Sequence, residues 1–459
     1  MRTPSILVTA LMLAGASALS AAADPVVQAT DRGQEQGTSE SAAMQAAPPT
    51  AKRYPVYGSF AELVQAPARV VPPVRAVTSG PKSHWFGYYD KFQLDPGNRY
   101  LLCMEVDFEH RLPESNEAVR IGMVDLAEGD RWIELGESRA WCWQQGCMLQ
   151  WRPGSDREVV WNDREGDRFV CRVLDVRTRH MRTLPRAIGS IRPDGQLAVC
   201  EDFSRIWSFR PGYAYAGIPD KYADQPAPAE IGVWRMDLNT GESRLIVSVA
   251  DLARIPYPQQ TPSDRHYVNH LSWSPDGKRF LLFNRWSGPG QPTRVFTADP
   301  DGQDLRLLSA RDASHWTWRD PEHVLIWAGG AYRLYQDDGS GESQETLWEA
   351  PNGHQTYVPG TRNEWLVSDT YPRGAEREQI LYLFHVPTRR FVLLGRFPST
   401  YQGEWRCDSH PRVSRDGKLV IIDSPHGGNG RQQFAIDIGP VLADATPCAD
   451  ATSVATPAP

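Results

Sequence analysis

The sequence predicts an all-β protein, a single seven-bladed β-propeller whose blades are four-stranded antiparallel sheets. Three observations predict this fold. A strand–turn–strand unit recurs seven times, each copy is followed by a third and often a fourth short strand, and no helical periodicity of comparable strength is present. Units of about 40 to 60 residues with four short strands are typical of propellers.

Each unit begins with a hairpin whose turn is usually rich in Pro, Asp and Gly, the residues that favour tight turns. The seven copies are FQLDPGNRYLLCM (92–104), LQWRPGSDREVVWN (149–162), GSIRPDGQLAVCE (189–201), LSWSPDGKRFLLFN (271–284), WTWRDPEHVLIWA (316–328), QTYVPGTRNEWLVS (355–368) and PRVSRDGKLVIID (411–423). The last unit lacks an outer strand, so we expect segment 52–78 to complete it and close the ring. The longest insertion, 203–230, lies in the third unit and is expected to cover the binding face.

The ends of the chain predict export. Residues 1–23 have a basic start, an apolar run and a small-residue ending, which is typical of a cleaved signal peptide. Residues 24–50 and 443–459 are rich in Ala, Ser, Thr and Pro and are expected to be a disordered linker and a disordered tail. The propeller is assigned to 51–442. We expect a monomer in the periplasm or outside the cell, with no membrane span.

Net charge and cysteine content limit the function classes. The formal net charge is −7, which disfavours nucleic acid as a partner. There are seven cysteines, so at least one is free or metal-bound, while Cys142 and Cys147 are close enough in sequence to pair.

Four consecutive units carry a histidine at the same repeat position, just before or within the first strand. These residues are His270, His315, His354 and His410. The first strand of each propeller blade lines the central channel, so equivalent positions converge around the axis. This spacing predicts a divalent-metal site made by His315, His354 and His410, with Cys407 as a thiolate ligand and Asp408 orienting an imidazole. Zinc or manganese suits these ligands. The alternative is that the histidines are ordinary polar residues lining the channel.

Other polar residues are expected at the same mouth of the channel, because the second strand of each unit returns to the level of the histidines. The predicted substrate-binding residues are Asn162, Arg164, Arg205, Arg285 and Arg431. The insertion adds Arg210, Tyr213 and Tyr215, while Arg265 and His84 stand near the starts of units four and one. Arginine pairs with carboxylates or sulfates, so the mouth suits an anionic polysaccharide or oligosaccharide.

Three stretches, HYVNHLSWSPDG, SHWTW and RCDSHPRVSRDG, resemble the seven-bladed propeller polysaccharide lyases, which include the oligogalacturonate and ulvan lyases. The resemblance implies β-elimination at a uronic acid. As a hypothesis, His270 or His84 is the base, Tyr213 or Tyr215 the acid, and Arg265 or Arg210 the carboxylate clamp. The sequence departs from the ulvan type, whose early-blade histidines are replaced here by Gln145 and Asn162.

Two other functions remain open. One is a non-catalytic periplasmic propeller, similar to the TolB-type scaffold, with a structural metal. The other is glycoside hydrolysis by a pair of carboxylates from Glu105, Asp107, Asp163 and Asp202. A serine peptidase is disfavoured because the sequence contains no G-x-S-x-G elbow.

Overall fold

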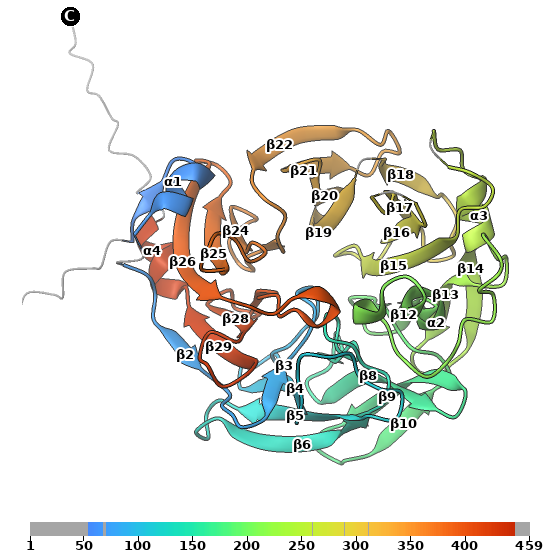
Figure 1. The fold of residues 1–459 in the computed structure, drawn as a ribbon, viewed down its shortest axis with the longest axis horizontal. Coiled ribbons are helices and arrows are strands. Elements are labelled where there is room, and N and C mark those ends of the chain that lie inside the picture. The colour runs from blue at the N-terminus through green and yellow to red at the C-terminus, as the bar shows by residue number, and fades with distance from the viewer. Residues whose placement is uncertain (1–53, 68–69, 259, 289, 311, 446–459) are drawn as a thin grey trace, which may run out of the picture. The chain divides into compact units, whose positions relative to one another are not determined.

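The structure, a computed structural model, describes residues 54–67, 70–258, 260–288, 290–310 and 312–445, all within one unit of the chain, Ala51–Pro459. Seven antiparallel sheets are arranged as blades in a ring (Figure 1), which confirms the predicted seven-bladed propeller. The predicted signal peptide and linker lie outside the described residues. The predicted tail lies mostly outside them, although its first three residues belong to helix α4 (Gly439–Ala445).

The first three blades each use four consecutive strands. They are β3 (Ser83–Trp85), β4 (Tyr100–Val106), β5 (Val119–Asp125) and β6 (Arg131–Ser138); β7 (Gln150–Trp151), β8 (Glu158–Glu165), β9 (Arg168–Asp175) and β10 (Met181–Leu184); and β11 (Ser190–Ile191), β12 (Leu197–Cys200), β13 (Gly232–Asp237) and β14 (Ser243–Ser248). Each blade runs outward from the axis (Figure 1).

The other blades follow the same order, with additions at the closure. They are β15 (His266–Trp273), β16 (Phe280–Trp286), β17 (Thr293–Ala298) and β18 (Arg306–Ser309); β19 (Ala313–Asp320), β20 (His323–Ala328), β21 (Ala331–Gln336) and β22 (Ser343–Glu349); β23 (Thr356–Tyr357), β24 (Trp365–Ser368), β25 (Glu378–His385) and β26 (Arg390–Pro398); and β27 (Arg412–Val413), β28 (Leu419–Ser424) and β29 (Gln432–Asp437).

The ring is closed by the N-terminal part of the described chain. Strand β2 (Val74–Ala76) pairs with β29 and supplies the outer strand of the last blade, as predicted for segment 52–78. A second strand, β1 (Val56–Tyr57), adds a fifth strand to the sixth blade. The sequence FAELVQ between them forms helix α1 (Phe60–Gln65), because Ser59 accepts a hydrogen bond from the Glu62 amide as an N-cap.

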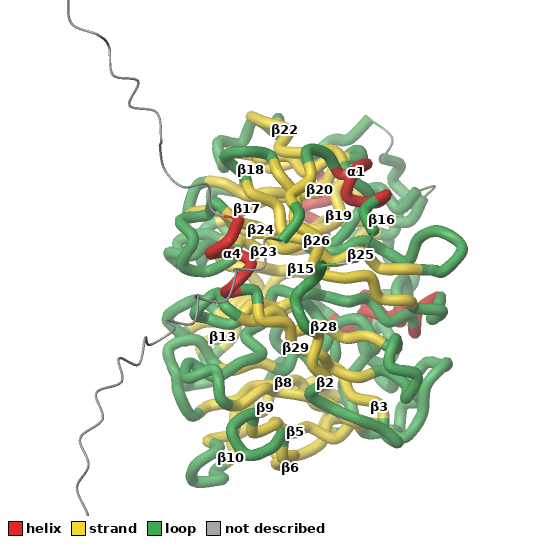
Figure 2. Tube along the Cα trace, turned by 90° about the vertical axis from the view of Figure 1, so that its left-hand side faces the viewer, coloured by secondary structure: helices red, strands yellow, loops and turns green. Residues whose placement is uncertain are grey.

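The core lies between adjacent blades, and this explains the strand sequences. A blade packs on both faces, so its middle strands are buried on both sides. Every residue of β16, FLLFNRW, is buried. Such strands read as apolar runs rather than alternating patterns. In the side view of Figure 2, strands and the loops that join them make up the body, and helices are few and short.

Backbone irregularities turn the channel-lining residues toward the axis. The pairing of β15 with β16 shifts register between Asn269 and Ser272, and His270 in this interval has φ +57°. Met148 and His410, its repeat equivalents in two other blades, also have positive φ, at +55° and +40°. Non-glycine residues rarely adopt this conformation, and bulges re-aim side chains near functional sites. These positive φ values therefore occur at residues that line the axis, where the candidate site lies.

Three connections from different blades meet over the axis and form a roof. They are the insertion with α2 (Phe203–Trp207) and 3-10 helix η1 (Pro211–Tyr213), the loop with 3-10 helix η2 (Gly403–Trp405), and the turn at 142–146. The Gly212 amide donates to Glu404 Oε2 at 2.9 Å, and Gln144 Nε2 donates to the Arg406 carbonyl at 2.9 Å.

Two further findings concern helices and thiols. Helix α3 (Val249–Arg254) follows β14, and none of the helices in the described part of the chain is long and apolar enough to cross a membrane.

The six described cysteines are buried and free, so the pairing of Cys142 with Cys147 is wrong. Instead, the Cys142 and Gly146 backbones pair with one another, and Cys147 Sγ lies 3.6 Å from Met104 Sδ.

Candidate metal and active site at the propeller axis

The structure brings the four repeat-equivalent histidines together at the axis. The ring centroids of His315 and His354 lie 4.1 Å apart, and those of His354 and His410 lie 4.3 Å apart. Tyr88 connects this group to His270, because its ring lies 5.0 Å from His410 and stacks on His270 at 5.2 Å. All four histidines are 1–3% exposed, so the roof covers them in this conformation.

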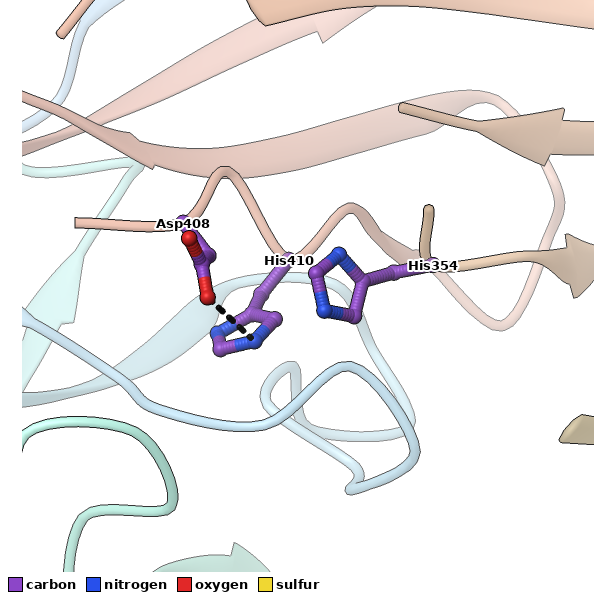
Figure 3. A group of neighbouring side chains, drawn as sticks. All are labelled: His354, Asp408 and His410. Carbon is purple, nitrogen blue, oxygen red and sulfur yellow. Dashed lines mark ion pairs between the residues drawn. The ribbon is translucent and has the colours of Figure 1, made fainter. Parts of the chain in front are cut away.

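Three side chains in this group are placed to hold a metal ion. One ligand atom from each of His354, Asp408 and His410 lies within 4.8 Å of the others (Figure 3). His354 Nε2, His410 Nε2 and Asp408 Oδ1 are buried without a hydrogen-bond partner among the described residues. Buried polar atoms are normally satisfied, so two unpartnered imidazole nitrogens, with Asp408 Oδ2 3.9 Å from His410 Nε2, fit a divalent cation. Two imidazoles and a carboxylate suit zinc or manganese.

Neighbouring side chains set the protonation of the imidazoles. His354 Nδ1 lies 2.9 and 3.1 Å from the two oxygens of Asp369, so it donates to this carboxylate and leaves Nε2 with its lone pair. His315 Nδ1 lies 2.8 Å from Asn352 Oδ1. Burial lowers the pKa of His315 and His410 well below the usual value, so both are neutral, the form that binds metals.

The ligand set differs from the sequence prediction in three residues. Asp408, predicted to orient an imidazole, joins His354 and His410, whereas Cys407 does not. The Cys407 thiol is buried outside the group of converging ligand atoms, and burial raises its pKa above the usual range. The His315 ring lies tilted against the His354 ring, but His315 is outside the group of converging ligand atoms found among the described residues.

A cationic region lies beside His270. Arg285 is 7% exposed, and no described residue forms a hydrogen bond or ion pair with its guanidinium. Arg210 packs over the Tyr213 ring at 3.8 Å and likewise pairs with no described carboxylate. Burial lowers the pKa of Arg285 and the charge of Arg210 lowers it further. A buried cation without an acid is costly, so this region fits an anionic ligand.

His270 is neutral in this environment. Burial lowers its pKa well below the usual value, and Arg285 and Arg210 add to this effect. Its Nδ1 lies 3.3 Å from Gln145 Nε2. A neutral imidazole beside an anion site is the arrangement that a general base requires.

Arg406, which sequence reasoning missed, links the two parts of the site. Its Nε donates to Asp408 Oδ2 at 2.9 Å, and its Nη2 donates to the Tyr213 hydroxyl. Tyr371 was also missed; its ring lies 5.6 Å from His354. Arg406 stands directly before Cys407 in the stretch RCDSH, and this proximity to the predicted metal ligands was the feature of the sequence that could have indicated it.

The structure places two predicted catalytic residues away from this cluster. His84 lies between Gln432 Oε1 at 2.9 Å and Glu105 Oε2 at 3.0 Å, where the last blade meets the first. Tyr215 stacks on Phe203 in the core and accepts a hydrogen bond from Asn162. These contacts assign both residues to the framework.

Predicted substrate-binding residues also have structural contacts. The side-chain amide of Asn162 donates from Nδ2 to the Ile188 carbonyl and accepts at Oδ1 from the Ile188 backbone amide. Arg205 uses all five donors within the protein, on Asp220 and on four backbone carbonyls. Arg164 donates to the Ser115 carbonyl, and Arg431 donates to the Trp405 carbonyl under the roof. Arg285 alone of the five has free donors at the cluster.

The last predicted clamp and the hydrolase carboxylates are also elsewhere. Arg265 lies over Phe209 at 4.8 Å. Glu105 pairs with Lys82 and Arg120, and Asp163 pairs with Arg172 at 2.8 Å. Asp107 lies 3.7 Å from Lys82, and Asp202 accepts from the Gly232 amide at 2.8 Å. All four carboxylates therefore have partners within the protein, which disfavours glycoside hydrolysis.

No protein-family model and no curated protein matches the chain. Solved structures with the same fold include an oligogalacturonate lyase in complex with manganese, at 15% identity and a TM-score of 0.59, covering 84% of this chain and 96% of that one. An oligogalacturonate lyase from Vibrio parahaemolyticus matches at 12% identity and a TM-score of 0.56, covering 84% and 98%. The fold is therefore a seven-bladed propeller shared with these lyases, in agreement with the resemblance found in the sequence.

Proposed function

We propose that this protein is a polysaccharide lyase that cleaves a uronic-acid glycan by β-elimination. The observation that carries the proposal is the position of a neutral histidine, His270, beside the buried guanidinium of Arg285 and the half-buried one of Arg210, neither of which pairs with a described carboxylate, next to converging metal-ligand atoms. A uronate would supply the missing negative charge. The fold likeness to two oligogalacturonate lyases supports the same reaction class.

In this proposal His354, His410 and Asp408 hold a divalent cation, zinc or manganese, with His315 beside them. When bound, the cation would neutralise the substrate carboxylate and make the proton at C5 more acidic. Asp369 fixes the ring of His354 by accepting from Nδ1. One of the similar solved structures is described as a complex with manganese, which favours testing this metal first.

His270 takes the proton from C5. Arg285 and Arg210 depress its proton affinity while the site is empty of anions. Burial is the larger cause of the lowered pKa of His270, and a carboxylate bound to these guanidiniums would cancel much of their smaller contribution and so raise this pKa. Substrate binding would therefore strengthen the base that acts on it.

Tyr213 is placed to protonate the leaving sugar oxygen. Its hydroxyl oxygen accepts from Arg406, so its own hydrogen remains free to be donated. Of the two tyrosines predicted for this role, it alone lies beside His270, with the ring centroids 5.8 Å apart.

We propose that the enzyme acts in the periplasm or outside the cell, to which the predicted signal peptide would direct it.

The test is ultraviolet absorbance of the unsaturated uronate that β-elimination produces. Purified protein with manganese or zinc would be mixed with oligogalacturonates, polygalacturonate, ulvan, alginate and glycosaminoglycans, with and without chelator. We expect a rise with at least one substrate, its loss in His270→Gln, and its retention in His323→Gln, a histidine of the fifth blade that pairs with Asp320. Metal binding without any rise across the panel would favour the non-catalytic scaffold.

A further inference from the structure

We infer that Gln145 is a positioning residue that determines which ring nitrogen of His270 carries the proton. The inference rests on the proposed function, in which His270 is the base. Gln145 comes from the turn between the first and second blades and reaches His270 in the fourth blade. In the sequence, Gln145 takes the place of an early-blade histidine expected of ulvan lyases, and that comparison assigned it no role.

The turn holds the Gln145 side chain in a fixed position. Cys142 and Gly146 exchange two backbone hydrogen bonds of 3.0 Å around it, and Gly146 has φ +58°. The adjacent Gln144 amide donates to the Gly212 carbonyl at 3.1 Å, which attaches the turn to the roof. Gln145 is 3% exposed. A buried amide on such a turn has little freedom other than rotation about its last bond.

The two orientations of this amide have opposite consequences for His270. With Nε2 of Gln145 toward Nδ1, the amide donates, Nδ1 holds the lone pair, and the ring proton sits on His270 Nε2. With Oε1 toward Nδ1, the amide accepts the Nδ1 proton and leaves His270 Nε2 with its lone pair. Gln145 Oε1 has no other partner among the described residues. The accepting orientation gives this oxygen a partner and puts the amide NH2 in its unpartnered place; it is the orientation that leaves His270 Nε2 free to take a proton.

The accepting orientation also favours proton uptake. Burial lowers the pKa of His270 most, and the charged or titratable groups that lower it further are Arg285 on β16, Arg210 in the insertion, His315 on β19 and Lys91 after β3. Two tyrosines, Tyr88 and Tyr213, also face its ring. A neutral carbonyl oxygen on Nδ1 opposes this trend, because its hydrogen bond becomes charge-assisted when the ring turns into imidazolium. Gln145 would thus direct the lone pair to one nitrogen and stabilise the product of proton transfer.

The first test measures the tautomer directly and needs no activity. Nitrogen NMR of histidine-labelled protein with zinc added, with the His270 signals assigned from His270→Gln, reports which nitrogen is protonated. We expect the Nδ1-protonated form in the wild type and a mixture of tautomers in Gln145→Met, which preserves the length of the side chain. Gln93→Met, which removes a buried amide that bonds Leu102 and Gln433 in the framework, should leave the wild-type tautomer. An Nε2-protonated His270 in the wild type, or an unchanged tautomer in Gln145→Met, would overturn the inference.

The second test uses the reaction. Gln145→Met should lower kcat about ten- to hundredfold, the effect expected from losing a hydrogen bond to a charged group, with KM little changed. Gln145→Glu, which can only accept when ionised, should restore kcat and move the acid limb of the pH profile to higher pH. Equal kcat in the wild type and Gln145→Met would contradict the positioning role. If no substrate is cleaved at all, the proposed function fails, while the NMR result still decides the role of Gln145.

Discussion

Replacing Arg285 by Met should stabilise the protein while weakening substrate binding. Arg285 is 7% exposed, its Nε has no hydrogen-bond partner, and none of the described residues forms an ion pair with its guanidinium. Methionine fills a similar volume without a charge. Removing an uncompensated buried cation should raise the free energy of unfolding by about 1 to 3 kcal/mol. Residues that are unfavourable for folding but retained are typical of functional sites.

Arg205→Met is the matched control, because it removes an equally buried arginine that has all its partners. Its guanidinium lies 2.9 Å from Asp220, and both side chains are 2–3% exposed. The substitution leaves Asp220 buried without its cation, which should cost about 3 to 5 kcal/mol. The two variants therefore have predicted effects of opposite sign.

Urea denaturation followed by tryptophan fluorescence measures both effects. On a cleaved substrate, Arg285→Met should also raise KM about ten- to hundredfold, the equivalent of one charge-assisted hydrogen bond. A loss of more than about 1 kcal/mol in Arg285→Met would refute the view that this charge lacks a partner in the folded protein. An unchanged KM would remove Arg285 from the substrate site.

Three further predictions concern the metal site and a buried carboxylic acid. Asp369→Asn removes the carboxylate that orients His354 and should weaken metal binding about 10- to 100-fold in competition with a chromophoric chelator, whereas Asp337→Asn in the fifth blade should not. Chelation should lower the melting temperature of the wild type but not of His354→Ala, because binding to the native state alone stabilises it; equal shifts would argue against this site. Burial raises the pKa of Glu201 from 4.5 to about 8, so the folded state keeps a proton that the unfolded chain releases. Stability is then greatest at low pH, and the wild type should lose about 1.4 kcal/mol relative to Glu201→Gln for each pH unit between these values. Parallel stability–pH curves would contradict this.

The sequence predicted the fold because propeller blades are specified locally. Each hairpin carries its own turn residues, and a strand buried on both faces reads as an apolar run wherever it occurs. The closure was also predictable, since a unit without its outer strand requires a strand from elsewhere. Helix α1 was not, because a single N-cap at Ser59 decided the local structure of a segment with no repeat to compare.

The site was predictable only where the repeat itself placed residues. The four histidines share one repeat position, so symmetry brings them together. The arginines do not share such a position, and their roles depend on partners far away in the sequence. Arg205 and Arg285 both stand near the ends of second strands, yet one finds Asp220 and backbone carbonyls of the insertion while the other finds no partner among the described residues. Composition and spacing do not distinguish these two cases.

The ring closure makes completion of the site a late event in folding. Thr78 and Gln432 are bonded although they lie 354 positions apart, and His410 belongs to the blade that β2 completes. Contacts of such long range form slowly, because the chain must first lose much of its conformational freedom. During synthesis the N-terminal part of the chain is made first, so β2 remains unpaired until the last blade has been made. The geometry that brings His410 to His354 therefore depends on the two ends of the propeller meeting, and deletion of β2 should disturb the axis as well as the rim.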